Sequence, residues 1–253
     1  MNDMAPPIKE SDSTSSWTFE PLGVVESCYT DSFGIPRQPG LAPSAFARIR
    51  MFSPFNDPNA FEGLNEVSHL WIQFVFHKQK SKRTWSPKVR PPRLGGNKSM
   101  GVFATRSPNR PNPIGLSVVK FEGIEQENKN LFIKVSGVDI LNGSPVLDIK
   151  PYVPYADHRP EANNGIAGIA PPLMKVAFAA YALEQMDQLK IKQLERFKAL
   201  VSETLANDPR PQYLVSDSGR EYVMELMGLE LRWCYLRGSA QQESILVSEV
   251  VKA

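Results

Sequence analysis

Five short loops, each at the end of an expected β-strand, combine turn residues with polar or charged side chains. They span residues 35–40, 77–78, 106–117, 139–145 and 148–152. Proline fixes φ and removes a backbone donor, so proline-rich loops lose little entropy when they hold a ligand. Each loop alone indicates only a turn, but five of them in one region predict a pre-formed binding pocket.

Familiar nucleotide-binding and hydrolase motifs are absent from the sequence. There is no GxGxxG after a strand, no phosphate-binding P-loop, no GxSxG nucleophile elbow and no HExxH. Two cysteines and three histidines without paired spacing predict reduced thiols and no metal site. A small-molecule hydrolase using Asp148 and Asp157 is one hypothesis, although their spacing pairs them on neither a helix nor a strand.

A run of positive charge follows the second loop, while the net charge of the chain is only +2. Trp85 lies within this run, and an indole among cations on a proline-stiffened backbone suits unstacked bases and phosphates. A solvated loop is the alternative, but the pattern favours nucleic acid. A non-catalytic RNA-binding β-barrel is therefore a second hypothesis. The basic residues are Lys78, Lys80, Lys82, Arg83, Lys88, Arg90 and Arg93, with no acidic residue among them.

The elements that must position these loops are mostly β-strands. The run 67–77 is almost continuously apolar, so we expect it to be buried on both faces, with His69 in the core. The spacing of the apolar runs is typical of an all-β sandwich or barrel. The predicted strands cover residues 18–26, 46–52, 67–77, 100–105, 116–125, 131–139 and 145–150.

A second region follows a segment rich in proline, glycine and asparagine. An apolar stripe near the 3.6-residue period predicts one helix over 171–206, and short strands follow over 212–216, 221–226, 229–236 and 244–251. We therefore expect a mainly β protein. Its parts are a disordered lead (1–17), a β domain (18–157), a linker (158–172) and a small α+β domain (173–253).

Several motifs in register resemble the TsaA/TrmO family. They are PRQPGL (36–41), SHLWI (68–72), VRPPRLGG (89–96), GVFATRS (101–107), RPNPIG (110–115) and DIKPY (148–152). The likeness is close over residues 19–157, and DPRPQY (208–213) is similar to the bacterial long form. The resemblance implies an S-adenosylmethionine-dependent methyltransferase that acts on N6-threonylcarbamoyladenosine beside the tRNA anticodon.

The same resemblance implies a β-barrel catalytic domain and a homodimer that binds the cofactor near the subunit interface. A barrel of this kind is consistent with the missing glycine motif. The fourth loop departs from the family in having Asn142-Gly143-Ser144 where Asp-Gly-Thr is common. Carried over residue by residue, the expected cofactor contacts are Pro36, Arg37, Gln38, His77, Lys78, Arg106, Leu116, Asp139, Ile140, Leu141 and Asn142.

The tRNA and its modified base also need contacts. Arg37, Arg106 or Arg110 could grip the threonine carboxylate, since a guanidinium binds a carboxylate with two hydrogen bonds. Arg110 could equally brace its loop, and Arg210 could cap the preceding helix instead of touching tRNA. The residues expected to contact substrate or tRNA are Arg110, Lys82, Arg83, Arg90, Arg93 and Arg210.

The expected chemistry needs little beyond positioning. Displacement at a sulfonium methyl depends on alignment, so neither a metal nor a covalent nucleophile is required. The acceptor N6 must lose a proton, and the sequence does not identify the base. No apolar run approaches the ~20 residues of a membrane span, and no signal-peptide core is visible. We therefore expect a cytoplasmic enzyme whose partners are tRNA and a second copy of the chain.

Overall fold

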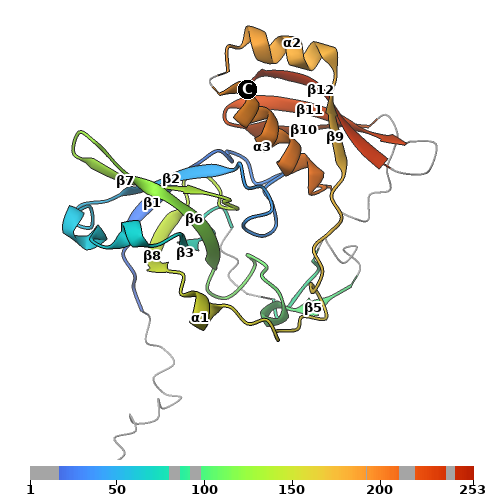
Figure 1. Cartoon of the computed structure of the whole chain (residues 1–253). Coiled ribbons are helices and arrows are strands. Elements are labelled where there is room, and N and C mark those ends of the chain that lie inside the picture. The colour runs from blue at the N-terminus through green and yellow to red at the C-terminus, as the bar shows by residue number, and fades with distance from the viewer. Residues whose placement is uncertain (1–16, 80–85, 92–97, 192, 211–219, 238–242) are drawn as a thin grey trace, which may run out of the picture.

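A computed structural model describes residues 17–79, 86–91, 98–191, 193–210, 220–237 and 243–253. The chain forms a β-barrel followed by a smaller sheet with two helices (Figure 1). The expected mainly β protein with a barrel and a small α+β part is therefore confirmed. In the described part of the chain, no helix is long and apolar enough to cross a lipid bilayer. Both cysteines, Cys28 and Cys234, are free.

The barrel closes in the order β1-β2-β7-β6-β3-β8, with antiparallel neighbours throughout. A short ribbon of β4 (Lys88–Val89) and β5 (Met100–Gly101) stands beside it. Short 3-10 helices lie at Pro58–Phe61, Leu64–Glu66 and Val102–Ala104, and α1 is Pro154–Asp157. The barrel strands are β1 (Gly23–Ser27), β2 (Phe46–Met51), β3 (His69–Val75), β6 (Ile114–Glu127), β7 (Asn130–Ser136) and β8 (Pro145–Pro151).

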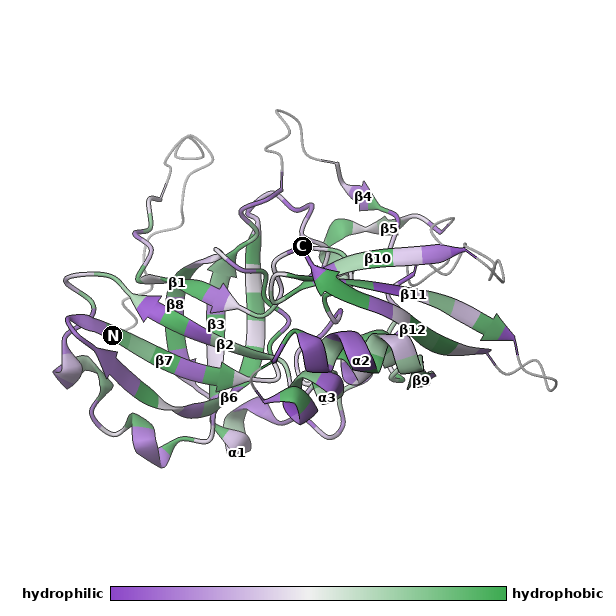
Figure 2. Ribbon diagram, turned by 90° about the horizontal axis from the view of Figure 1, so that it is seen from above, coloured by the Kyte–Doolittle hydropathy of each residue, from purple (hydrophilic) through white to green (hydrophobic). Residues whose placement is uncertain are grey.

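The strands alternate between the barrel interior and its surface, because successive side chains of a strand point to opposite faces. Along β3, Leu70, Ile72 and Phe74 are buried and the residues between them are partly exposed. The same alternation appears as changing hydropathy along the barrel strands in Figure 2. The expectation that β3 is buried on both faces was wrong. His69 is likewise exposed rather than in the core, with Nδ1 2.9 Å from the Ser68 hydroxyl.

The C-terminal sheet has the order β10-β11-β12-β9, with β9 parallel to β12. The single helix expected over 171–206 was wrong, because this segment holds a strand and two helices. Positive φ angles at Lys190 and Gln193 separate the helices, and such angles end a right-handed helix. The elements are β9 (Lys175–Phe178), α2 (Ala180–Gln188), α3 (Leu194–Ala206), β10 (Glu221–Leu226), β11 (Leu229–Arg237) and β12 (Glu243–Lys252).

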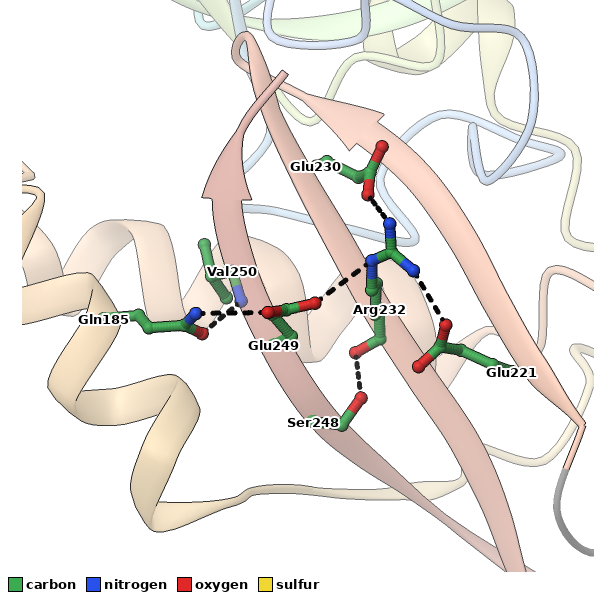
Figure 3. Close-up of polar contacts among 7 residues, drawn as sticks. All are labelled: Gln185, Glu221, Glu230, Arg232, Ser248, Glu249 and Val250. Carbon is green, nitrogen blue, oxygen red and sulfur yellow. Dashed lines mark hydrogen bonds and ion pairs between the residues drawn. The ribbon is translucent and has the colours of Figure 1, made fainter.

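Strand β12 carries a bulge, and beside it the strand is joined to α2 (Figure 3). Ser248 has no register partner on β11, and its hydroxyl donates instead to the Arg232 carbonyl at 3.1 Å. The backbone N–H of Val250 donates to the side chain of Gln185 on α2 at 2.9 Å. Val250 lies beyond the part of β12 that pairs with β9, so the α2 side chain accepts a hydrogen bond that no strand takes there. On the same sheet, Arg232 forms ion pairs with Glu221, Glu230 and Glu249.

The segment between β1 and β2, residues 28–45, joins the barrel to the C-terminal sheet. The Tyr29 hydroxyl lies 3.2 Å from the hydroxyl of Thr204 on α3 in a buried hydrogen bond. The ring of Phe33 stacks on Trp233 with centroids 6.0 Å apart. One hydrophobic cluster therefore runs from the barrel interior into the C-terminal sheet.

Polar contacts reinforce this joint. Glu203 on α3 accepts hydrogen bonds from the Ser44 backbone N–H at 2.7 Å and from the Ser44 hydroxyl at 2.9 Å. The Asn207 side chain donates to the Leu41 carbonyl at 3.0 Å. Because residues 28–45 include the first predicted cofactor loop, α3 and the C-terminal sheet together support the segment that carries that loop.

Candidate active site

The first predicted cofactor loop is held from two sides. Pro36 is buried, Gln38 is partly exposed and Arg37 is exposed. The backbone N–H of Gly40 donates to the Gly137 carbonyl at 2.8 Å, which ties this loop to the one after β7. On the other side, Arg37 Nη2 donates to the Arg210 carbonyl at 3.3 Å. The loop therefore has a defined position between the barrel and the C-terminal sheet.

A hydrogen bond joins this loop to the segment 106–117. Arg106 Nη1 donates to Gln38 Oε1 at 2.5 Å. Arg106 itself is exposed, so its guanidinium keeps access to solvent and to a ligand. Two residues that the sequence assigned separately to the cofactor site thus meet, although 68 positions separate them along the chain.

Arg110 braces the same segment from within. Its Nη1 donates to the Thr105 carbonyl at 3.2 Å and to the Ser107 carbonyl at 3.4 Å. The Thr105 hydroxyl donates to the Val102 carbonyl at 2.9 Å and closes the preceding 3-10 turn. Of the two roles considered for Arg110, the geometry shows the bracing role. Contact with the substrate stays a prediction.

Strand β6 presents different side chains to the two faces of the barrel wall. Ile114 and Leu116 point outward and are 40% and 50% exposed, whereas Gly115 and Ser117 are buried. The Ser117 hydroxyl donates to Asp139 Oδ1 at 2.5 Å. Leu116, a predicted cofactor contact, therefore offers an apolar surface immediately beside a buried polar pair.

Asp139 is a carboxylate in an unfavourable place for charge. Burial raises the pKa of Asp139 from its ordinary value of 3.8 to about 6, and this effect exceeds the lowering by the Ser117 hydrogen bond and the Arg106 charge. Perturbed carboxyl groups cluster at functional sites. Asp139 is thus a candidate for proton chemistry as well as for cofactor contact.

The loop after Asp139 is anchored to β1 rather than left open. Asn142 Oδ1 accepts from the Ser27 backbone N–H at 3.0 Å, and the Asn142 N–H donates to the Tyr29 carbonyl at 2.8 Å. Ile140 is buried, whereas Leu141 is partly exposed. The Asn142 side chain is therefore engaged in holding the loop, so a cofactor contact from this loop would come mainly from its backbone.

His77 and Lys78 follow β3 and are both exposed. His77 Nδ1 lies 3.3 Å from the hydroxyl of Ser144, so this loop contacts the fourth one. Partial burial, and then the charge of Lys78, lower the pKa of His77 below its ordinary 6.5. The imidazole is consequently neutral at physiological pH and can accept a hydrogen bond.

A cavity of about 380 Å³ opens where the first loop meets the C-terminal part. Arg37 and Gln38 form the barrel side. The opposite side includes Arg210, which the sequence assigned to tRNA contact, and Asp208 and Glu243, which it did not assign to the site. No local pattern reveals Glu243 as a partner, because it stands 33 positions after Arg210.

Arg210 has a structural role in this arrangement. It is 8% exposed, with ion pairs to Asp208 at 3.1 Å and to Glu243, and its guanidinium lies 3.9 Å from the ring centroid of Tyr235. This geometry does not favour the expected tRNA contact, because the charged group is already paired and covered.

The remaining basic candidates divide into two sets. Arg90 is exposed beside the β4–β5 ribbon, as an RNA-contacting residue requires. Lys82, Arg83 and Arg93 lie outside the described residues.

Two family models match nearly all of the described chain. The tRNA-methyltransferase O N-terminal domain matches residues 24–158, and the TrmO C-terminal domain matches residues 171–253. A tRNA (adenine(37)-N6)-methyltransferase of Escherichia coli is 43% identical over 221 residues, which cover 87% of this chain and 93% of that protein. A Pseudomonas aeruginosa protein with the provisional name S-adenosylmethionine-dependent methyltransferase RcsF is 46% identical over 86% of this chain and 92% of its own length.

A solved structure extends the likeness to three dimensions. The crystal structure of TrmO from Pseudomonas aeruginosa superposes with a TM-score of 0.73 at 38% identity, covering 94% of this chain and 99% of that one. The family models match both parts of the chain, and the superposition with the crystal structure covers nearly all of it. The chain therefore belongs to the tRNA-methyltransferase O family.

Proposed function

We propose that this protein is an S-adenosylmethionine-dependent tRNA methyltransferase that methylates N6 of adenine 37. Relatives named tRNA (adenine(37)-N6)-methyltransferase carry this activity in their names, one of them covers 87% of the chain, and the family models match both of its parts. The observation that carries the proposal is the connected site. Contacts link Gln38 to Arg106, Ser117 to Asp139, and His77 to Ser144 in the loop that begins at Asp139. The non-catalytic RNA-binding alternative is not supported, because the relatives are named as methyltransferases.

The site residues fit the cofactor chemically. Arg37 and Arg106 are exposed guanidiniums that suit the carboxylate of a methionine moiety, and Leu116 offers an apolar surface for an adenine face. The backbone of residues 140–142 would bind the polar edge of the cofactor's adenine. When bound, S-adenosylmethionine supplies an activated methyl group. The protein's residues then have to align the acceptor nitrogen and accept its proton.

The modified base is the finer part of the proposal. We propose N6-threonylcarbamoyladenosine as the acceptor, because its carboxylate would find a cation in Arg37 or Arg106 at the mouth of the site. Arg90 and the run of basic residues around it would contact the anticodon arm through phosphates. A cytoplasmic location is part of the same proposal, and a tRNA substrate supports it.

A second copy of the chain is also part of the proposal. Phe103, Ile114 and Leu116 are 72%, 40% and 50% exposed, and apolar side chains this open in one segment suit burial against a partner. Leu116 would then lie at the subunit interface and at the cofactor site together. A sedimentation experiment on the full chain should give a dimer, and a Leu116→Asp variant should give more monomer.

The hydrolase hypothesis receives no support from the geometry. Asp148 forms an ion pair with Lys150 at 2.7 Å, and Asp157 accepts a hydrogen bond from the Trp71 indole N–H at 2.8 Å. Neither carboxylate is poised to act on a bound ester or amide.

The direct test combines the purified chain, S-adenosylmethionine labelled in its methyl group, and tRNA with or without the threonylcarbamoyl group. Nucleoside mass spectrometry should find the label on the threonylcarbamoyladenosine nucleoside. Label on unmodified adenine 37 would keep the activity and refute the finer substrate. Absence of label from both tRNAs, with calorimetry showing no cofactor binding, would refute the function.

A further inference from the structure

We propose that Asp139, held by the hydroxyl of Ser117, is the base that removes the proton from the acceptor nitrogen. The inference rests on the proposed methyltransferase function and adds a catalytic residue to it. Ser117 acts as a positioning residue that orients the carboxylate.

The location of Asp139 is the first argument. It begins the loop whose next three residues are predicted cofactor contacts, and its hydrogen-bond partner Ser117 follows Leu116 on β6. The charge of Arg106 acts on the same carboxylate. Asp139 therefore lies where two separate segments of the expected cofactor site meet.

The chemical state of Asp139 is the second argument. In the described part of the chain, no cation lies within ion-pair distance of this carboxylate, and its partners are a neutral hydroxyl and its own backbone N–H. The other charged or titratable groups that act on it are Arg106 and Tyr29. Burial strongly raises the pKa of Tyr29, so the phenol stays neutral. With a pKa of about 6, Asp139 is ionised at neutral pH yet more basic than an ordinary carboxylate.

Other carboxylates near the site are already engaged. Asp148 pairs with Lys150, Glu203 accepts two hydrogen bonds from Ser44, and Asp208 is shared by Arg210 and Tyr235. Each of these stabilises the structure by neutralising or bonding the charge. Asp139 differs in that burial raises its pKa and no ion pair among the described residues offsets this burial, a combination found more often at functional sites than in structural carboxylates.

The proposed step balances in bonds and charge. The acceptor nitrogen lies in a urea-like group, so its lone pair is delocalised and its N–H must be lost. The nitrogen forms the new N–C bond to the methyl group, and the S–C bond breaks with its electron pair going to sulfur. The N–H proton passes to an oxygen of Asp139, which later releases it to solvent. The positive charge of the sulfonium is thus discharged as one proton.

The test measures single-turnover methylation of threonylcarbamoyl tRNA by the full-length wild type and by Asp139→Asn. Asparagine still accepts the Ser117 hydrogen bond but does not take up a proton. We expect a rate loss of about 100-fold or more, with cofactor affinity within about threefold of wild type. Asp187→Asn makes the same chemical change at an exposed carboxylate on α2, outside the site, and should retain the wild-type rate.

The pH profile separates a base from a structural residue. The wild-type rate should rise with pH through about 6 and then level off, and Asp139→Asn should lose this rise. Ser117→Ala should move the rise to higher pH, because the Ser117 hydrogen bond lowers the Asp139 pKa. A purely structural role would leave the shape of the profile unchanged in both variants.

Different outcomes would refute the assignment of Asp139 as the base and the proposed methyltransferase function. If the wild type transfers methyl groups and Asp139→Asn does so within about threefold, the base assignment is wrong and the function stands. If Asp139→Asn loses cofactor affinity in proportion to rate, Asp139 is a cofactor contact and again not the base. If the wild type transfers no methyl group to any tRNA, the proposed function itself fails.

Discussion

A methyl group added at Gly115 should displace the ring of Phe74. The two residues are directly opposed across β3 and β6. A Cβ at position 115 would lie 2.3 Å from Phe74 Cζ and 2.6 Å from both Cε atoms. The ring is 3% exposed and packs edge-on against Phe76 at 5.1 Å, so it has little room to move. Gly115→Ala should therefore strain the barrel interior.

The size of the effect follows from opposing contributions. Overpacking a well-filled core costs about 1–3 kcal/mol. Replacing glycine by alanine in a strand returns about 0.5–1 kcal/mol through lower backbone entropy in the unfolded chain. A net loss of about 1–2 kcal/mol should remain, which is a fall in Tm of roughly 2–8 °C for a chain of this size.

Scanning calorimetry on Gly115→Ala, Phe74→Leu and the double variant tests the reasoning. Phe74→Leu removes the ring atoms that meet the new methyl group, so the double variant should be more stable than the sum of the single effects by about 1 kcal/mol or more. Additive effects, or a Tm for Gly115→Ala within about 1 °C of wild type, would show that the ring moves freely.

Three further predictions concern charged side chains. Arg106→Ala should weaken cofactor binding about tenfold, by loss of a charge-assisted hydrogen bond, and should leave the circular dichroism spectrum unchanged; unchanged affinity in calorimetry would contradict the site. Arg210→Met should lower the free energy of unfolding by about 3 kcal/mol, because it leaves two carboxylates without their cation. This is the lower end of the range for a broken buried pair, since the side chains of Asp208 and Glu243 are about a quarter exposed. A Tm change under about 3 °C would show that the fold does not depend on Arg210. The folded pKa of Asp139, about 6, exceeds its ordinary value of 3.8, so the folded state loses stability as the pH rises through this interval. Asp139→Asn removes this loss and should raise the free energy of unfolding at pH 7.5 by an amount on the order of 2–3 kcal/mol. The gain should vanish in melts at pH 4, and a pH-independent difference would refute the pKa argument.

The sequence predicted the barrel because the hydropathy pattern of each strand shows which of its faces is buried. Alternation in segments such as Phe46–Met51 reflects one face packed inside the barrel and one outside, and this is visible locally. The helix expected over 171–206 failed for the opposite reason. Lys175–Phe178 is a strand only because it pairs with β12, which lies about 70 residues later. Predicted limits of the lead, linker and domains stay predictions.

Site residues were predictable where a motif carried them and unpredictable where a distant partner decides their role. Gln38 and Arg106 were both assigned to the cofactor, and they meet in the structure. Arg210 stands in an equally conspicuous motif, yet its partner Glu243 turns it inward. A motif shows that an arginine has a specific role, but it does not show whether the guanidinium binds a ligand or forms an ion pair within the protein.

The position of residues 28–45 gives the C-terminal part a share in the chemistry. This segment carries Arg37 and Gln38, and nearly all of its anchors outside the barrel come from α3 and the strands after it. Loosening these anchors would let Gln38 move away from Arg106, whose charge lowers the pKa of Asp139. A change in the C-terminal part would therefore reach the proposed base through the Gln38–Arg106 hydrogen bond and the charge of Arg106, without any residue of that part touching the methyl group.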